Sequence, residues 1–398
     1  MKRETIITAI TSAVFLLVFL ISRCIITPTV NHDEPVKIGF IYDGDESIPY
    51  TNNFMRAQRE VENMFGDKVE ILARSNVAGD DVAAVLEEFA ERNCALIFTT
   101  TYTYEIIAKE VAEKYPNVHF CQASGDNAHE EPFIKNYHTF MGEIYQGRYI
   151  SGIVAGMKLK ELIENGIISE SEAKVGYVGA YPYSEVISGY TAFFLGVRSI
   201  VPNATMHVVY TYTWGSFSQE KICAEHLIEE GCKIISQHSD TVGPAVACEE
   251  NFEKNVFHVG YNQSMIGIAP MTSLISTRIN WIPYVTGAVS AVLRNEPIEK
   301  SIKGRVHGND IGASFDLNWV QMLDLNSIIA AKGTDEKITE TIKAFKKNKI
   351  FVFKGDYVGV NPYDETDMFD LKKGFKENSS SSAPLFHYIL KDVITVEE

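Results

Sequence analysis

The chain has 398 residues, of which 45% are hydrophobic, and it carries a formal net charge of −16 at pH 7. This length and hydrophobic content allow two domains of ordinary size, each with its own core, and they exclude disorder as the default. The negative charge and the lack of a Lys/Arg run argue against nucleic acid as a partner, because phosphate binding needs a concentrated basic surface. A small uncharged or cationic ligand fits this charge better.

The N-terminal segment, residues 1–35, has the layout of an export or anchoring segment. Two basic residues precede an apolar stretch at 6–21, which places the rest of the chain outside the cytoplasmic membrane. Cys24 follows this stretch as the lipidated residue of a bacterial lipoprotein would, but Arg23 stands where a small residue is usual. We therefore favour a retained membrane anchor, with lipid attachment to Cys24 second and simple secretion third.

From residue 36 onward, short apolar runs alternate with longer helical patterns. Strands are expected at 37–42, 69–73, 95–100 and 118–122, and helices at 53–64, 82–91 and 105–114. Regular alternation of strand and helix is typical of an α/β fold with a doubly wound parallel sheet.

The same pattern then recurs at a spacing of 137 or 138 residues. Matching segments begin at residues 37 and 174, 93 and 231, 117 and 255, and 137 and 275. Four matches in the same order indicate two lobes of one architecture. We predict that 36–142 with 280–312 forms lobe one and that 143–279 with 313–375 forms lobe two. Residues 376–398 are expected to be a Ser-rich linker and tail, in which 377–382 form a flexible linker and 383–398 have no assigned structure.

A ligand cleft is expected between the lobes, because ligands of open parallel sheets bind beyond the carboxyl ends of the strands. The residues that follow strands at this edge are Thr101, Tyr102, Tyr104, Ser124, Gly125, Ser239, Asp240, Tyr261 and Asn262. Aromatic residues crowd the same loops, namely Tyr42, Tyr50, Tyr102, Tyr104, Tyr181, Tyr183, Tyr212, Trp214, Tyr261 and Trp281. Stacking faces combined with a few directed polar groups predict a site for an aromatic heterocycle such as a nucleobase.

Motifs for chemistry are weak in this sequence. His238, Ser239 and Asp240 have the residue types of a hydrolase triad, but consecutive strand residues point to opposite faces. The GIVAG run at 152–156 has GxxxG spacing and predicts close helix packing. The GYVG run at 176–179 lacks the third glycine of a dinucleotide loop. We therefore expect neither a catalytic residue nor a cofactor.

The six cysteines lie at positions 24, 94, 121, 223, 232 and 248. They form no CxxC pair and have no His at metal-ligand spacing, so a metal site is not indicated. We expect them to be small buried hydrophobic residues. A disulfide between Cys223 and Cys232 is the alternative in an exported protein.

Six segments carry a family resemblance. They begin at Met141, Val175, Ala192, Gln237, Val259 and Ile275, and they read MGEIYQGRYISGIVAGM, VGYVGAYPYSEVISGY, AFFLGVRSIVPNAT, QHSDT, VGYNQSM and ISTRINWIPYV. Their order and spacing resemble the basic membrane protein family of substrate-binding proteins, in the branch associated with purine bases or nucleosides. The resemblance implies a type I periplasmic binding fold. It also implies an extracytoplasmic lipoprotein that closes two lobes around a purine and passes it to the permease and ATPase of an ABC importer.

The resemblance also assigns site residues, with one departure. It places the family's strand-end Asp of lobe two on Asp240, its GYN turn on 260–262, its Trp on Trp214 and its Asn-Trp crossing on 280–281. Similar proteins carry a Gly-Gly-Trp-Asn run and a following His in the first loop, whereas this chain reads SIPYTNNF at 47–54. Tyr50 can replace the stacking Trp of that run, but Phe54 cannot donate a hydrogen bond as His does.

The predicted ligand-binding residues are Tyr50, Tyr102, Ser124, Trp214, Asp240, Asn262 and Trp281. Tyr50 and Tyr102 are expected to stack on the ligand ring, and polar groups of lobe two are expected to fix its edge. The chain crossings near Gly142 and Asn280 are expected to act as hinges. An anchored sensor that presents the same fold to a signalling partner is the alternative to an importer subunit, because both need an external cleft and a membrane attachment.

Overall fold

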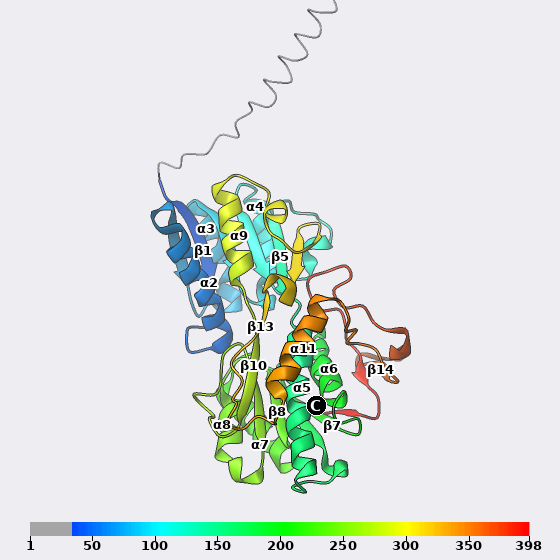
Figure 1. The fold of residues 1–398 in the computed structure, drawn as a ribbon. Helices are drawn as coiled ribbons and strands as arrows, with labels where there is room; N and C mark the ends of the chain where they lie inside the picture. Colours follow the sequence, from blue (N-terminus) through cyan, green and yellow to red (C-terminus); the bar gives the residue numbers. More distant parts are fainter. Residues whose placement is uncertain (1–33, 398) are drawn as a thin grey trace, which may run out of the picture.

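The computed structural model describes residues 34–397. The predicted N-terminal anchor and Cys24 lie outside the described residues. Among the residues that are described, no helix combines the length and the apolar character that a membrane span requires. The described chain forms two lobes, each built on a seven-stranded sheet (Figure 1).

The first lobe has helices on both faces of its sheet. Its strands are β1 (Val36–Ile41), β2 (Val69–Arg74), β3 (Cys94–Thr99), β4 (His119–Ala123), β5 (Tyr137–Gly142), β11 (Arg305–His307) and β12 (Asp310–Ala313), in the order β11-β12-β5-β4-β3-β1-β2. Helices α2 (Pro49–Phe65) and α9 (Ile282–Leu293) pack on one face, and α3 (Val82–Glu91) and α4 (Glu105–Lys114) pack on the other. A short helix, α10 (Ile298–Ser301), follows α9. The central strands are buried almost throughout, as expected for a parallel sheet that is covered on both sides.

The second lobe repeats this plan. Its strands are β6 (Lys174–Gly179), β7 (Thr205–Tyr210), β8 (Ile234–His238), β9 (Phe257–Tyr261), β10 (Ser273–Ile279), β13 (Val320–Met322) and β17 (Ile394–Glu397), in the order β13-β10-β9-β8-β6-β7-β17. Its helices are α5 (Tyr145–Glu164), α6 (Ser184–Arg198), α7 (Phe217–Glu229), α8 (Gly243–Glu250) and α11 (Thr334–Lys346). Without β11 and β17, the two strand orders correspond one to one, so the predicted internal repeat is confirmed.

The expected elements of lobe one agree with the structure except at the start of α2. This helix begins at Pro49 rather than near Asn53. Proline suits this position because the N–H groups of the first helical turn have no partner within the helix, so its missing N–H costs nothing there. It ends at Phe65 and is capped by Gly66, whose positive φ of 51° suits a residue without a side chain. The earlier start brings Tyr50 into the first turn of α2.

Helices α5 and α6 pack at very short range through glycines. A Cβ atom on Gly152 would lie 1.8 Å from the carbonyl oxygen of Phe193, and one on Gly196 would lie 2.1 Å from that of Tyr149. The predicted role of the GxxxG spacing in close helix packing is therefore confirmed. The five described cysteines are also free and buried, so the alternative disulfide between Cys223 and Cys232 is not formed.

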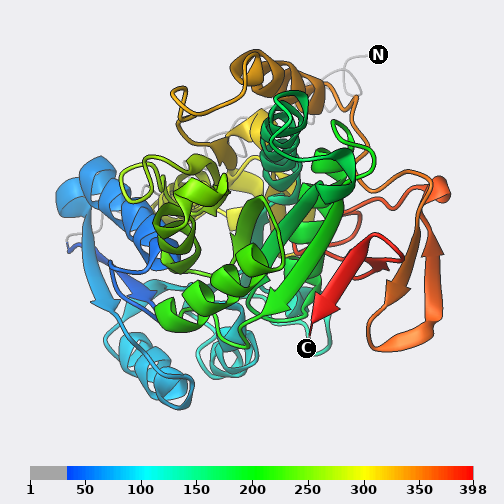
Figure 2. The ribbon, with the colours of Figure 1, turned by 90° about the horizontal axis from the view of Figure 1, so that it is seen from below.

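The C-terminal residues form more structure than predicted. Strands β14 (Val358–Asn361), β15 (Asp364–Asp370) and β16 (Ile389–Leu390) make a small third sheet beside the second lobe (Figures 1 and 2). Strand β17 then joins the second sheet, parallel to β7. Ser382 is buried and donates hydrogen bonds to Asp310 through both its backbone N–H and its hydroxyl. Within the predicted linker, Ser381 and Ser382 are therefore buried, whereas Ser379 and Ser380 are exposed.

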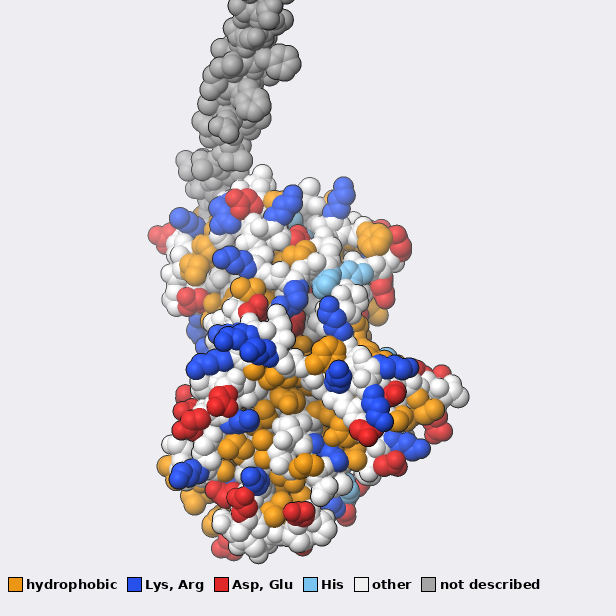
Figure 3. Space-filling view, turned by 45° about the vertical axis from the view of Figure 1, so that its right-hand side comes forward, with side chains coloured by type: hydrophobic (Ala, Val, Ile, Leu, Met, Phe, Trp, Pro, Cys, Tyr) orange, Lys and Arg blue, Asp and Glu red, His pale blue; other side chains and the backbone are white. Residues whose placement is uncertain are grey.

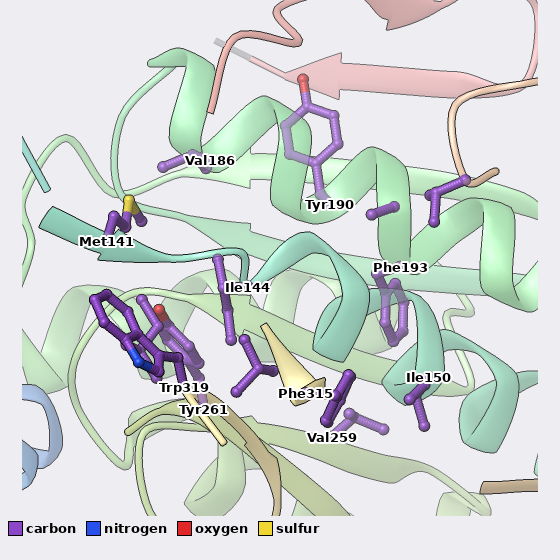
Figure 4. Packing of buried hydrophobic residues seen from close by; sticks show 14 of the residues in the cluster. Met141, Ile144, Ile150, Val186, Tyr190, Phe193, Val259, Tyr261, Phe315 and Trp319 are labelled. Atoms are coloured by element: carbon purple, nitrogen blue, oxygen red, sulfur yellow. The ribbon is translucent and has the colours of Figure 1, made fainter. Parts of the chain in front are cut away.

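An apolar cluster runs through both lobes. It contains Phe40 of β1 and Val208 of β7, and the crossing segments between the lobes add Ile144, Phe315 and Trp319 to it (Figure 4). Burial of each such side chain contributes about 2 kcal/mol, so the crossings are held by the same core that holds the sheets. On the face seen in Figure 3, acidic and basic side chains are interspersed over both lobes.

We predict that Gly152→Ala strongly destabilises the second lobe, because α5 and α6 must separate to admit the new methyl group. The expected loss in the free energy of unfolding is about 3 kcal/mol, measured by denaturant unfolding followed by circular dichroism. Gly79→Ala is the matched control, since a Cβ atom there has no neighbour within 4 Å. Equal stability of the two variants would contradict the close packing of these helices.

Candidate functional site

A small cavity lies where the carboxyl ends of strands from both sheets meet. About 310 Å³ of space lies between its walls, and part of that space is open to solvent. Its lining residues are Tyr50, Thr101, Tyr102, Ser124, Glu185, Trp214, His238, Asp240 and Tyr261. Five of the seven predicted binding residues are therefore brought together, although they come from five different segments of the chain. The five are Tyr50, Tyr102, Ser124, Trp214 and Asp240.

Tyr50 forms an aromatic wall of the cavity from the first lobe. Its hydroxyl donates a hydrogen bond to the carbonyl oxygen of Thr100, directly after β3. Its ring meets Trp281 edge to face, with ring centroids 6.3 Å apart, and it also contacts Phe54. Hydrogen bond and ring contacts together hold Tyr50 in one orientation, so it presents a preformed surface to a ligand.

The second lobe supplies aromatic side chains of its own. Trp214 lies between the end of β7 and α7, and its ring centroid is 5.5 Å from that of Tyr181 and 6.3 Å from that of Tyr183. The Trp214 Nε1–H is buried and has no hydrogen-bond partner among the described residues. A buried indole N–H usually finds a partner, so this donor is available to a ligand acceptor.

A buried glutamate organises the loop that carries Asp240. Glu220 of α7 accepts hydrogen bonds from the Ser239 hydroxyl at 2.8 Å and from the Thr241 backbone N–H at 3.1 Å. The Asp240 N–H itself donates to the carbonyl oxygen of Trp214 at 2.8 Å. With its two neighbours held by Glu220, the Asp240 side chain lies in the lining of the cavity. Burial raises the pKa of Glu220 to about 7.

The cavity is rich in carboxyl groups. Burial raises the pKa of Asp240 well above its usual value, and the nearby carboxylates of Asp43, Glu220 and Glu185 raise it further. Burial likewise raises the pKa of Asp43. Ligand N–H or O–H groups that donate to these oxygens would replace the hydration that the carboxyl groups lose.

A buried arginine counters part of this negative charge. The Arg148 guanidinium lies 3.6 Å from the ring centroid of Tyr261 and donates through Nη1 to the carbonyl oxygen of Gln237 at 2.7 Å. Its positive charge lowers the pKa of Asp240, against the effect of burial. Among the described residues, its Nε and Nη2 groups have no hydrogen-bond partner. The charged floor under Tyr261 was not found by sequence reasoning.

Two predicted residues do not line the cavity. Trp281 is buried and stacks on Phe54 with ring centroids 4.3 Å apart, so it supports Tyr50 from behind. Asn262 is buried directly after β9 with φ at 66°, and its backbone N–H donates to Thr277. Its neighbour Tyr261 takes the place in the lining.

The residues His238, Ser239 and Asp240 do not form a relay. The Ser239 hydroxyl donates to Glu220, while His238 Nε2 lies 3.4 Å from a carboxylate oxygen of Glu185. Burial lowers the pKa of His238 to about 4, which keeps its ring neutral at physiological pH. His238 and Ser239 therefore have different partners, and neither bonds to Asp240, as the alternation along a strand predicted.

Besides Arg148 and Glu220, sequence reasoning missed three further residues at the site. Glu185 and His238 both line the cavity, and Asp43 lies close enough to Asp240 to affect its pKa. Asp43 is the second residue after the end of β1, so the strand-end argument that found Asp240 could have found it as well. Glu185 lies in the first turn of α6 and carried no such signal. Among the described residues, no group of His, Cys, Asp and Glu side chains could hold a metal ion.

Comparison with known proteins gives a consistent family. The model of the Bmp family, described as ABC transporter substrate-binding protein PnrA-like, matches residues 36–352. A purine-binding protein of Brucella abortus is 31% identical over 263 residues, which are 66% of this chain and 70% of that protein. A putative ABC transporter glucose-binding protein of Haloferax volcanii is 32% identical over 229 residues, which are 58% of this chain and 54% of that protein.

Solved structures share the fold at low sequence identity. A solute-binding protein of an ABC transporter system from Conexibacter woesei aligns with a TM-score of 0.60 and 15% identity, over 79% of this chain and 97% of that chain. A carbohydrate transporter solute-binding protein from Agrobacterium radiobacter, in complex with D-arabinose, aligns with a TM-score of 0.52 and 16% identity, over 78% of this chain and 100% of that chain. The predicted α/β architecture of two parallel-sheet lobes is confirmed.

We predict that Glu220 makes the protein less stable as pH rises. Its pKa is about 7 in the folded state against 4.5 for an ordinary Glu, so the folded state keeps a proton that the unfolded state has released. The contribution of this group to the free energy of unfolding therefore falls by about 3 kcal/mol as pH rises from the lower to the higher pKa. In Glu220→Gln, this slope of stability against pH is expected to flatten.

The measurement is denaturant unfolding at a series of pH values across this range. Glu229→Gln is the matched control, because Glu229 is an exposed carboxylate of the same helix. An unchanged slope in Glu220→Gln would show that Glu220 does not titrate in this way.

Proposed function

This chain belongs to the Bmp family of PnrA-like ABC transporter substrate-binding proteins, and we propose from this premise that it captures a purine base or nucleoside for an ABC importer. Proteins of this family bind a small molecule and are not enzymes. Their partners are the permease and ATPase subunits of the transporter. Because the family is one of ABC transport, we prefer the importer role to that of an anchored sensor.

The observation that carries the purine proposal is the combination of aromatic faces and buried carboxyl groups in one small cavity. Tyr50 and Tyr102 of the first lobe and Trp214 of the second offer ring faces, and Asp240 offers buried acceptor oxygens. A planar heterocycle gains about 1 kcal/mol per stacked ring pair beyond its area burial. Its ring or exocyclic N–H groups can donate to Asp240, which fixes the orientation of the ring edge.

The name of one relative supports this ligand, and the name of another suggests a sugar. The Brucella relative is named as a purine-binding protein, whereas the Haloferax relative is named as a putative glucose-binding protein. We place the purine first because the cavity has ring faces on both lobes, which suits a flat ligand clamped between them. Glucose therefore belongs in any ligand panel as the second candidate.

Closure of the lobes is proposed to occur at the chain crossings. The Asn280 N–H donates to the carbonyl oxygen of Trp319 at 2.7 Å, and the Glu143 N–H donates to that of Ala313 at 2.9 Å. The three crossings therefore run side by side, and a small rotation there would separate Tyr50 from Asp240. Ligand contacts made with both lobes would favour the closed state, and a transporter could sense that state.

We also propose that the N-terminal segment keeps the protein at the extracytoplasmic face of the membrane, as a retained helix or through a lipid on Cys24. Its support is the charge and hydropathy pattern of the sequence. Tethering near the permease would raise the local concentration of loaded protein at the transporter.

We predict that a purine base or nucleoside raises the midpoint of thermal unfolding, whereas glucose and amino acids do not. A ligand at 100 times its Kd adds about 2.7 kcal/mol to the stability of the folded state. The measurement is thermal denaturation against adenine, guanine, adenosine, guanosine, glucose and a set of amino acids. A shift with glucose and none with any purine would contradict the proposed ligand class.

Asp240→Asn is expected to weaken purine binding about tenfold or more, because an amide donor then faces the ligand donor in place of a carboxyl oxygen. Binding is measured by isothermal titration calorimetry, and thermal unfolding of the free variant shows whether it is folded. The matched control is Asp324→Asn, at an exposed position outside the cavity. An affinity equal to that of the control would remove Asp240 from the site.

A further inference from the structure

We propose that the C-terminal segment 353–397 builds an outer subsite at the mouth of the cleft, where it holds the hydroxyl-bearing sugar of a nucleoside. This inference rests on the proposed function and specifies its ligand. The segment lies beyond residues 36–352, the part of the chain that matches the family. A subsite made by this segment therefore belongs to this chain and is not part of the matched region.

The outer subsite is a second cavity that lies next to the first. About 750 Å³ of space, part of it open to solvent, lies between its walls, and it shares Tyr102, Ser124 and Glu185 with the inner cavity. The C-terminal segment contributes Asn361, Tyr363, Ala383, Pro384 and His387 to its lining. A ring that occupies the inner cavity can therefore extend a substituent past Ser124 and Glu185 toward the C-terminal segment.

The C-terminal wall is held in place by hydrogen bonds within the third sheet. The Asn361 side chain donates to an Asp367 carboxylate oxygen at 3.0 Å, and the Tyr388 hydroxyl donates to the other oxygen at 3.2 Å. His387 Nε2 lies 3.6 Å from the same carboxylate. Tyr363 donates from its hydroxyl to the carbonyl oxygen of Pro182, on the opposite wall of the outer cavity, at 2.9 Å. These hydrogen bonds hold Asn361 and Tyr363 in place before any ligand binds.

Both lobes anchor the segment that carries this wall. Strand β17 pairs in parallel with β7 of the second lobe. Ser382 donates to the buried Asp310 of β12, in the first lobe, and Asp310 also accepts from the Thr139 hydroxyl at 2.9 Å. The chain from Ser382 to β17, red in Figures 1 and 2, therefore begins at a contact with the first lobe and ends in the sheet of the second. These two contacts hold the segment against both lobes.

The chemistry of the lining selects a neutral, hydroxyl-rich group. Asp126 and Glu185 offer carboxylates, and Ser124, Ser184 and Asn361 offer hydroxyl and amide groups. The described lining contains no Lys or Arg side chain, so a phosphate would meet carboxylates without a compensating cation. Sugar hydroxyls can donate to the carboxylates, and the Tyr102 and Tyr363 rings can cover the apolar face of the sugar. A nucleoside would contact the lining of both cavities, whereas a free base would contact only that of the inner one.

The test compares matched ligands by isothermal titration calorimetry on the full-length protein. The ligands are adenine and guanine, their nucleosides adenosine and guanosine, and the two nucleoside 5′-monophosphates. The variants Tyr363→Ala and Asn361→Ala remove outer contacts, and Tyr363 is exposed enough for its loss to leave the fold intact. Met368→Ala is the matched control, an exposed side chain of the same sheet that is outside the lining.

We expect wild-type protein to bind nucleosides more tightly than bases and monophosphates. In Tyr363→Ala and Asn361→Ala, nucleoside affinity should fall about tenfold while base affinity stays within about twofold. Equal losses for base and nucleoside, no loss for either, or monophosphate binding as tight as nucleoside binding would each overturn the outer subsite alone. Wild-type protein that binds none of these ligands would overturn the proposed function together with the subsite.

Discussion

The packing of the chain crossings against one another sets the geometry of the whole molecule. Strand β5 ends at Gly142 and β10 ends at Ile279, and a Cβ atom on Gly142 would lie 2.8 Å from the Ile279 side chain and 3.1 Å from the carbonyl oxygen of Trp319. Because both strands leave their sheets at the carboxyl end, this contact forces the carboxyl ends of the two sheets to face each other. The loops that follow the strands of one sheet therefore face the loops that follow the strands of the other, and the cleft lies between them.

This arrangement buries carboxyl groups in the cleft, which is energetically unfavourable for their charged forms. The facing strand ends bring Asp43 and Asp240 together, and the first turn of α6 adds Glu185, so burial and mutual repulsion raise the pKa of Asp240. Glu220 fixes the loop around Asp240, and Arg148 offsets part of the negative charge from beneath Tyr261. Such an environment is unfavourable when empty and favours a ligand that brings hydrogen-bond donors, which is the property that a substrate-binding protein needs.

The C-terminal segment changes the cleft from a two-walled to a three-walled site. It is held by the second lobe through β17 and by the first lobe through Asp310, so the same contacts that place it also connect the lobes outside the crossings. Any opening of the lobes must therefore move this segment or stretch its contact with Asp310. Opening of the cleft for a ligand therefore depends on movement of the C-terminal segment as well as on rotation at the hinge.

The sequence by itself determined the repeat, because the alternation of strand and helix and the spacing between matched segments are local properties of the chain. With the rule that ligands bind beyond strand ends, it also predicted that Tyr102, Ser124 and Asp240 would meet, although these residues are far apart in the chain. Only the tertiary structure decided which neighbour at each strand end faces the cavity. Tyr261 lines it instead of Asn262, and Trp281 stacks on Phe54 behind Tyr50. Packing partners from distant segments make such choices, as Asp310 does for the buried Ser382, and no pattern within a short stretch of sequence records those partners.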